Sequence, residues 1–228
     1  MQGEIERVLA KISGEQIRIT GAGRTDAGVH ASGQVIDFRM ARDMAQDELA
    51  RGVNALLPQD IAVSELEPEA EAFHARFSAT GRTYEYRMRC ARVRDPLWVR
   101  RELLVEDALD LEAMIAASGA LVGGHDFAAF AAGVTGEREV RRAGWSSEGD
   151  VRRFTIEANA FLRGMVRGIV GTMLWVGRGK MTAERFREVL RSGDRALAGP
   201  SAAAKGLCLV AVRYDGTSGR DGESENDE

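Results

Sequence analysis

The sequence predicts an α+β protein made of two similar halves, each resembling the ferredoxin-like β-α-β-β-α-β unit. Helical and strand-like patterns alternate along the chain, as α-β-β-α-β in the first half and β-α-β-β-α-(α)-β in the second. Of the 228 residues, 44% are hydrophobic and 29% are charged, as is typical of globular proteins. The first half lacks the strand that opens the second half, so we expect the chain to be N-terminally short.

The first half begins with a predicted helix over residues 2–13. Ile5, Val8 and Leu9 recur there at helical spacing, and Gly14 follows as a C-cap. The remaining elements expected in this half are strands at 16–20, 33–39 and 60–67, a helix at 46–57, and a glycine-rich segment over 21–28.

The second half opens with a predicted strand over residues 83–90, in which alternate residues from Tyr84 onward share one face. Residues 137–147 and 151–160 are expected to form a hairpin across Gly149 and Asp150. Further elements are helices at 109–121, 162–176 and 182–191, and a strand at 206–214. The predicted organisation is therefore an N-terminal half of residues 1–80, a C-terminal half of residues 81–215, and a disordered acidic tail of residues 216–228.

The composition bounds the class of function. Cys90 and Cys208 form no CxxC pair, and the three histidines lack metal-ligand spacing, so we expect a reducing cytoplasm and no metal site. The start of the chain shows no signal peptide, and the longest apolar run, 169–176, is too short to span a membrane. Of the 31 basic residues 28 are Arg, which permits nucleic-acid binding although the net charge is −4.

The densest candidate for chemistry is the segment GAGRTDAGVHA, residues 21–31. A dinucleotide-binding loop is excluded because Asp26 stands where the third glycine belongs, and a P-loop lacks its Gly-Lys-Ser/Thr. The segment is either a tight turn with Asp26 as a cap or a site in which Asp26 is a nucleophile or base. A lone Asp among backbone amides and an arginine such as Arg24 stays ionised, as that chemistry requires.

Two further segments carry arginines beside apolar side chains. In residues 73–87, FHARFSATGRTYEYR, aromatics alternate with arginines, which suits either base stacking with phosphate contact or a half-buried strand. In residues 159–171, NAFLRGMVRGIVG, Arg163 and Arg167 share one face of the predicted helix. An arginine there either extends to water or has a buried acidic partner, for which Asp26 is a candidate.

Together these segments resemble the tRNA pseudouridine synthase A family. The matching stretches are GRTDAGVHA, HARFSA with RTYEY, and FLRGMVRGIVG, and the segments LVGGHDFAAF, VNALLPQDIAV and KGLCLVAVRY are similar as well. The resemblance covers residues 2–214, whereas the opening strand and aromatic motif of the family are absent. It implies two ferredoxin-like halves with antiparallel sheets around a central cleft, and an N-terminal half that carries the catalytic loop.

The resemblance also implies an activity and its residues. The expected reaction is isomerisation of uridine to pseudouridine in tRNA, at positions 38 to 40 of the anticodon stem-loop, by a cytoplasmic homodimer without cofactor. Asp26 matches the catalytic carboxylate, Arg167 the arginine paired with it, and Tyr84 the tyrosine that contacts the uracil. RNA contacts are expected from Arg24, Arg76, Arg82 and Arg163.

Two alternatives to this function follow from the sequence. The first is a non-catalytic RNA-binding protein, because the N-terminal shortening removes part of the family pattern. The second is a nucleotide-dependent enzyme that uses GAGRTDAG as a phosphate cradle, which the glycine spacing disfavours. Attack on the sugar, attack on the base, and abstraction of a ribose proton are all chemically open to Asp26.

Overall fold

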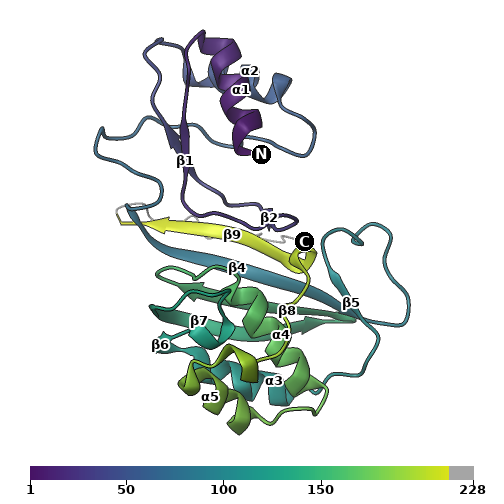
Figure 1. Cartoon of the computed structure of the whole chain (residues 1–228). Helices are drawn as coiled ribbons and strands as arrows, with labels where there is room; N and C mark the ends of the chain where they lie inside the picture. Colours follow the sequence, from purple (N-terminus) through teal and green to yellow (C-terminus); the bar gives the residue numbers. More distant parts are fainter. Residues whose placement is uncertain (216–228) are drawn as a thin grey trace, which may run out of the picture. The chain divides into compact units, whose positions relative to one another are not determined.

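The computed structural model describes residues 1–215 and has the predicted α+β class (Figure 1). The chain forms two compact units: unit 1 comprises Met1–Gly23 and Val35–Ser78, and unit 2 comprises Arg24–Gln34 and the chain from Ala79 onward. The sequence-based division placed 24–34 in the N-terminal half, whereas the structure groups these residues with unit 2. The expected tail, 216–228, lies outside the described residues.

Unit 1 packs two helices against a short antiparallel sheet. Helix α1 ends at Gly14, whose φ of 80° is the left-handed C-cap that the sequence predicted. The buried core includes Val8 and Leu9 of α1 and Leu49 and Val53 of α2. The elements of unit 1 are α1 (Gln2–Ser13), β1 (Ile19–Gly21), β3 (Ile36–Phe38) and α2 (Gln46–Leu56).

The strand predicted at 60–67 is wrong, because the structure has no regular element there. Ile61 and Val63 still pack against the unit 1 core, so the apolar pattern reports burial without a strand. The side chain of Asn54 takes the place of a neighbouring strand: its Oδ1 accepts from Val63 N at 2.8 Å, and its Nδ2 donates to Val63 O at 2.7 Å. Among the described residues of unit 1, only β1 and β3 pair as a sheet.

Unit 2 contains a seven-stranded mixed sheet in the order β2-β9-β4-β8-β7-β6, with β5 also paired to β4. The pairs β2–β9 and β4–β5 are parallel and the others are antiparallel, so the sheet is mixed, where an antiparallel one was expected. Its strands are β2 (His30–Ala31), β4 (Ala79–Cys90), β5 (Leu103–Val105), β6 (Gly123–Asp126), β7 (Glu137–Glu148), β8 (Val151–Ala158) and β9 (Leu207–Tyr214).

The predicted hairpin is confirmed, with Gly149 in its turn at φ 54°. The first strand predicted for this half is also present, and it is longer than expected because β4 lies between β8 and β9 and pairs with both. The strands β2, β5 and β6 were not predicted. They are two to four residues long, which is too short for an alternating pattern to be read.

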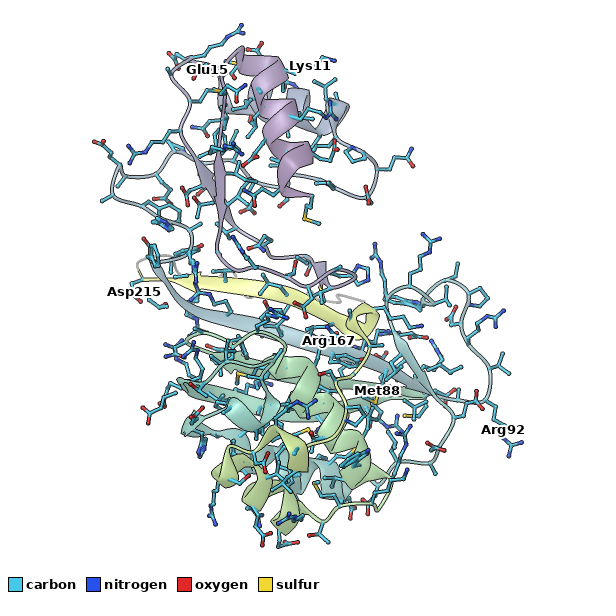
Figure 2. All side chains as sticks on the ribbon, viewed as in Figure 1. Lys11, Glu15, Met88, Arg92, Arg167 and Asp215 are labelled. Atoms are coloured by element: carbon cyan, nitrogen blue, oxygen red, sulfur yellow. The ribbon has the colours of Figure 1, made fainter. Side chains whose placement is uncertain are left out.

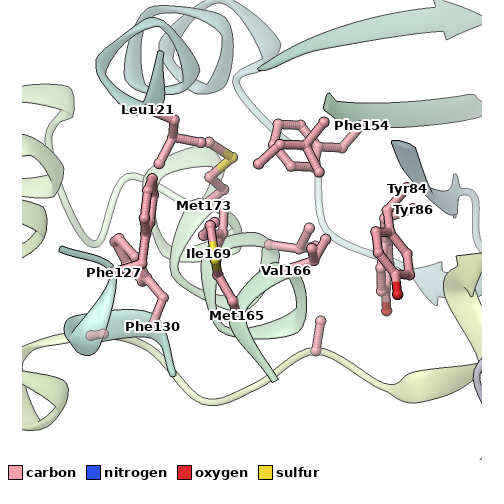
Figure 3. Close-up of a cluster of buried hydrophobic side chains, with 14 of the residues drawn as sticks. Tyr84, Tyr86, Leu121, Phe127, Phe130, Phe154, Met165, Val166, Ile169 and Met173 are labelled. Atoms are coloured by element: carbon pink, nitrogen blue, oxygen red, sulfur yellow. The ribbon is translucent and has the colours of Figure 1, made fainter. Parts of the chain in front are cut away.

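Helices α3 (Leu111–Ser118), α4 (Met165–Gly177) and α5 (Ala183–Ser192) belong to unit 2 and pack on its sheet (Figure 1). Each lies within a predicted helix or extends it by one residue at the C-terminal end. The expected helix at 109–121 changes to a 3₁₀ turn at Gly119–Leu121. Figure 3 shows the core between these layers, where Met165, Ile169 and Met173 of α4 meet Phe127 and Phe130.

Candidate active site

The Asp26 loop, Arg24–Gln34, lies along the edge of the unit 2 sheet. Its turn is closed by Val29 N, which donates to Asp26 O at 3.1 Å, and Gly28 adopts a left-handed φ of 81°. The loop then pairs with β9, because His30 lies opposite Cys208 in a parallel ladder. At Gly33 a Cβ atom would collide with the carbonyl of Val210, so only glycine allows the loop this close to the sheet. The sheet edge therefore fixes where Asp26 stands.

Asp26 forms an ion pair with Arg167, as the sequence suggested. Arg167 Nη1 donates to Asp26 Oδ2 at 2.8 Å. Arg167 Nε donates to Ala202 O at 2.8 Å, and Ala202 N donates in return to Arg167 O at 2.9 Å. The guanidinium is thus held from two sides, and it orients a carboxylate that remains 37% exposed to solvent. Figure 2 shows Arg167 within unit 2.

The position of α4, which carries Arg167, depends on two glycines. A Cβ atom on Gly168 would overlap the carbonyl of Phe130, and one on Gly171 would overlap the carbonyl of Pro200. The helix therefore packs directly against the backbone on both sides. This close packing brings Ala202 within hydrogen-bond distance of Arg167 and fixes the direction of the guanidinium.

Tyr84 lies on β4 with only 8% of its surface exposed. Its ring meets Phe161 edge to face, with centroids 5.0 Å apart. The pKa of Tyr84 is raised to about 12, mainly because the residue is buried; the positive charge of Arg82 opposes the rise, and the negative charge of Asp26 adds to it. Tyr84 is therefore a neutral phenol near pH 7, and it lies close enough to Asp26 to feel its charge.

The neighbouring Tyr86 has a different role, although the two tyrosines share one face of β4 and one end of the core (Figure 3). Tyr86 is fully buried, and its hydroxyl donates to Ala203 O at 2.8 Å. Burial raises the pKa of Tyr86 as well. Its hydroxyl is thus used to hold the chain segment next to Ala202, which supports Arg167.

The four arginines expected to contact RNA lie in different environments. Arg24 and Arg163 are exposed in unit 2. Arg76 is exposed in unit 1, with its guanidinium carbon 5.6 Å from the ring centre of Phe77. Arg82, however, is only 9% exposed, and its Nη1 donates to the backbone carbonyls of Ala79 and Asn159. The burial of Arg82 and its two carbonyl partners favour a structural role over the expected RNA contact.

The expectation that Arg163 and Arg167 share a helix face is wrong. Helix α4 begins at Met165, and Gly164 before it has a left-handed φ of 72°. Arg163 therefore precedes the helix, where its carbonyl accepts from Ala132 N at 2.9 Å. The apolar pattern extended the predicted helix to residue 162 because Leu162 is buried, and a buried leucine is compatible with a helix as well as with a turn.

The sequence patterns did not indicate a functional role for Phe161, Ala202 or residues 91–102. Phe161 contacts Tyr84 and could have been noticed as the aromatic residue before Arg163. Ala202 acts through its backbone, which leaves no signature in the sequence.

Within residues 1–215, no group of three or more His, Cys, Asp and Glu side chains is arranged to hold a metal ion. No helix in the same range has the length and apolar character needed to span a membrane.

Comparison with known proteins finds clear relatives. A family model described as tRNA pseudouridine synthase matches residues 1–78 and 117–215. The tRNA pseudouridine synthase A of Chloroflexus aurantiacus is 46% identical over 222 residues, which cover 94% of this chain and 80% of that protein. The proteins of the same name from Paraburkholderia xenovorans and a Geobacillus species are each 40% identical, over 94% of this chain and 81% and 89% of their own lengths.

Proposed function

We propose, because the chain belongs to the tRNA pseudouridine synthase family, that it isomerises uridine to pseudouridine in tRNA. In this reaction the bond between C1′ of the ribose and N1 of the base breaks, and a bond between C1′ and C5 forms. N1 gains a proton and C5 loses one, so the atoms and electrons balance without an oxidant or a group donor. The reaction therefore needs a group that assists the exchange of the bonds at C1′ and a group that can move a proton; we assign the first role to a carboxylate.

The ion pair between Asp26 and Arg167 is the observation that carries the proposal. It presents a partly exposed carboxylate whose direction is fixed by a guanidinium that is itself anchored on Ala202. A carboxylate in this arrangement is oriented before the substrate arrives, which lowers the reorganisation needed during reaction. Asp26 is thus the catalytic group of the proposal, and Arg167 is the residue that positions it.

Tyr84 is the proposed substrate-binding residue. Its phenol is neutral near pH 7, as that of an ordinary tyrosine is, and burial raises its pKa to about 12, so it keeps the proton well into the alkaline range. A neutral phenol can donate a hydrogen bond to the uracil and can take part in proton transfer. Because Phe161 holds the ring edge to face at 5.0 Å, the hydroxyl is presented from a fixed position.

The exposed arginines Arg24, Arg76 and Arg163 are the proposed RNA contacts outside the reacting centre. Guanidinium groups on the surface suit the phosphates of a tRNA, whose target base must leave its stack to reach a carboxylate. We further propose that the target lies at positions 38 to 40 of the anticodon stem-loop and that the enzyme is a cytoplasmic homodimer. These three points rest on the resemblance to the family.

The test is to incubate the purified chain with an unmodified tRNA transcript and to map pseudouridine by carbodiimide-blocked reverse transcription. New stops within the anticodon stem-loop are expected with the wild-type chain and not with Asp26→Asn. The alternative of a non-catalytic RNA-binding protein predicts tRNA binding without stops. Modification at sites outside this stem-loop would contradict the proposed target.

A further inference from the structure

The segment between β4 and β5, residues 91–102, forms an arm that leaves the end of the unit 2 sheet (Figure 1). We call these residues the arginine arm. The arm has its own internal structure, because Trp98 N donates to Asp95 O at 3.1 Å and Arg101 N donates to Trp98 O at 2.7 Å. It lies between the two stretches that the family model matches, so the family match gives it no role.

The base of the arm is fastened to the sheet by a buried carboxylate. Glu102 is 3% exposed, and its two oxygens accept from Arg89 Nε at 2.6 Å and from Arg87 Nε at 3.1 Å. Arg89 also bonds Asp95 at 3.1 Å. The guanidinium of Arg87 lies over the ring of Trp98, 4.0 Å from its centre. The arm is therefore a fixed projection of β4.

The C-terminal part of the arm also contacts the segments that build the candidate active site. His30 Nε2, in the Asp26 loop, donates to Arg100 O at 2.8 Å. Lys205 Nζ donates to Val99 O at 3.0 Å. Lys205 lies three residues after Ala202, whose carbonyl accepts from Arg167. These contacts place the arm beside the loop that carries Asp26, within the same unit.

The arm carries a concentrated positive charge on a chain whose net charge is −4. Four of its arginines are exposed, and the one acid between them, Asp95, is already paired with Arg89. No ion pair to the side chains of these four is present among residues 1–215. Arg92 points away from the sheet (Figure 2). The four are Arg92, Arg94, Arg100 and Arg101.

Two kinds of partner suit such a surface, since Val93 and Leu97 are also exposed, at 76% and 88%. A second copy of the chain whose arm met this arm at a two-fold axis would bring two identical surfaces together. Four arginines would then face four arginines, and like charges in contact oppose association. A phosphate backbone neutralises the same charges and releases counterions, which favours binding. The charge therefore favours nucleic acid.

We propose that the arginine arm binds the tRNA backbone next to the target nucleotide and holds the stem against the Asp26 loop. This inference rests on the proposed function for its ligand, but it concerns binding and not the chemical step. A guanidinium group can donate two parallel hydrogen bonds to a phosphate, and the arm presents four guanidinium groups from a rigid base. The anchoring through His30 ties the bound backbone to the loop that carries the reacting carboxylate.

The test compares two triple variants with the same change in charge. In the first, Arg94, Arg100 and Arg101 become Gln. In the second, Arg185, Arg187 and Arg191 of α5 become Gln; Arg185 and Arg187 form only exposed ion pairs within that helix. Binding of unmodified tRNA by the full chain is measured by filter retention at several salt concentrations, together with kcat at saturating tRNA and the oligomeric state in sedimentation.

For the arm variant we expect Kd to rise at least roughly tenfold and the slope of log K against log salt to fall by about 2, because each phosphate contact contributes about 0.7–0.9. The α5 variant is expected to keep the wild-type Kd and kcat. Equal affinity in wild type and arm variant, or equal losses in both variants, would overturn the proposal.

The oligomeric state and the turnover of the wild-type chain separate RNA binding by the arm from dimerisation and from catalysis. Loss of the dimer in the arm variant would make the arm an interface between copies and would overturn the RNA assignment. Wild-type chain that binds tRNA through the arm but forms no pseudouridine would overturn the proposed function and leave the arm as an RNA-binding surface. Wild-type chain that does not bind tRNA would overturn both.

Discussion

The side chains of Asp26 and Arg167 form a 2.8 Å ion pair although the two residues are 141 positions apart in the chain. One of them lies in a loop at the sheet edge and the other near the start of α4. Arg167 donates from Nε to the carbonyl of Ala202 and from Nη1 to Asp26. The geometry of the proposed reaction therefore depends on contacts among three separate parts of unit 2.

Replacement of Asp26 by Asn is expected to abolish isomerisation, because the amide keeps the shape of the side chain and removes its charge and nucleophilicity. Affinity for tRNA is expected to fall by less than about tenfold, or about 1.4 kcal/mol. Asp26→Ala is expected to lose turnover equally. Single-turnover assays and filter binding measure the two quantities. Turnover retained by Asp26→Asn would move the chemistry to another residue.

Replacement of Arg167 by Lys tests whether two directed hydrogen bonds are needed as well as a charge. A lysine keeps the positive charge but cannot reach Asp26 and Ala202 with a rigid fork. We expect kcat to fall by at least roughly tenfold with little change in KM, and Arg167→Ala to lose turnover completely. Arg178→Lys is the matched control, since Arg178 pairs with Asp107 away from the site. A wild-type kcat in Arg167→Lys would show that turnover needs the positive charge but not the two directed hydrogen bonds of the guanidinium.

The hydroxyl of Tyr84 is tested by comparison with Tyr86. Tyr84→Phe is expected to keep tRNA affinity and lose turnover, because only the proton-transfer group is removed. Tyr86→Phe removes the hydrogen bond to Ala203, so it is expected to lower stability by about 1 kcal/mol and to keep turnover. Equal kcat in Tyr84→Phe and wild type would exclude the hydroxyl from the mechanism.

A stacking role of the Tyr84 ring predicts a further loss in Tyr84→Ala. Base–aromatic stacking is worth about 1–3 kcal/mol, so this variant is expected to bind tRNA roughly 5- to 150-fold more weakly. Tyr84 is 8% exposed, so removal of its ring also leaves a cavity, and a melting curve must accompany the binding data. Unchanged affinity in a folded Tyr84→Ala chain would exclude stacking.

The buried phenol of Tyr84 also predicts a loss of stability at alkaline pH. Its pKa is about 12 in the folded chain and 10.0 for an ordinary tyrosine. Between these values the unfolded chain loses a proton that the folded chain keeps, so this contribution is fully present below about pH 10 and is lost toward pH 12. The difference corresponds to roughly 2–3 kcal/mol.

Urea unfolding at several pH values between about 9 and 12 measures this effect. Tyr84→Phe is expected to lose less stability across the range than the wild type, because it has no proton to release at this position. Tyr86 is present in both chains, so its own contribution cancels in the comparison. Parallel stability curves for the two chains would show that Tyr84 is not buried as described.

Removal of Glu102 is expected to destabilise unit 2, because Arg87 and Arg89 then lose the carboxylate between them. We expect Glu102→Ala to lower Tm by at least about 4 °C. The control is Glu188→Ala on α5, whose carboxylate is 59% exposed and pairs with Arg185. This exposed pair contributes little to stability, so no measurable shift is expected. Equal Tm values for both variants would contradict the anchoring of the arginine arm.

The sequence by itself determined the elements whose causes are local. Helix α1 follows from apolar spacing and from Gly14, which accepts a left-handed φ of 80° at low cost. The β7–β8 hairpin follows from two alternating strands around Gly149. The prediction that Asp26 is the reacting group came from the resemblance of residues 21–31 to the family motif, and it stays a prediction.

Only the tertiary structure decided features that depend on distant partners. Residues 60–67 have the pattern of a strand, but a strand forms only where a neighbour offers a ladder, and Asn54 satisfies Val63 instead. The two-residue strand β2 exists only because β9 lies beside it. Arg82 and Arg163 are both arginines in matching motifs, yet one is buried against carbonyls and the other is exposed. A hydrophobic pattern states that a side chain is buried, whereas the partner it meets is fixed by how the whole chain packs.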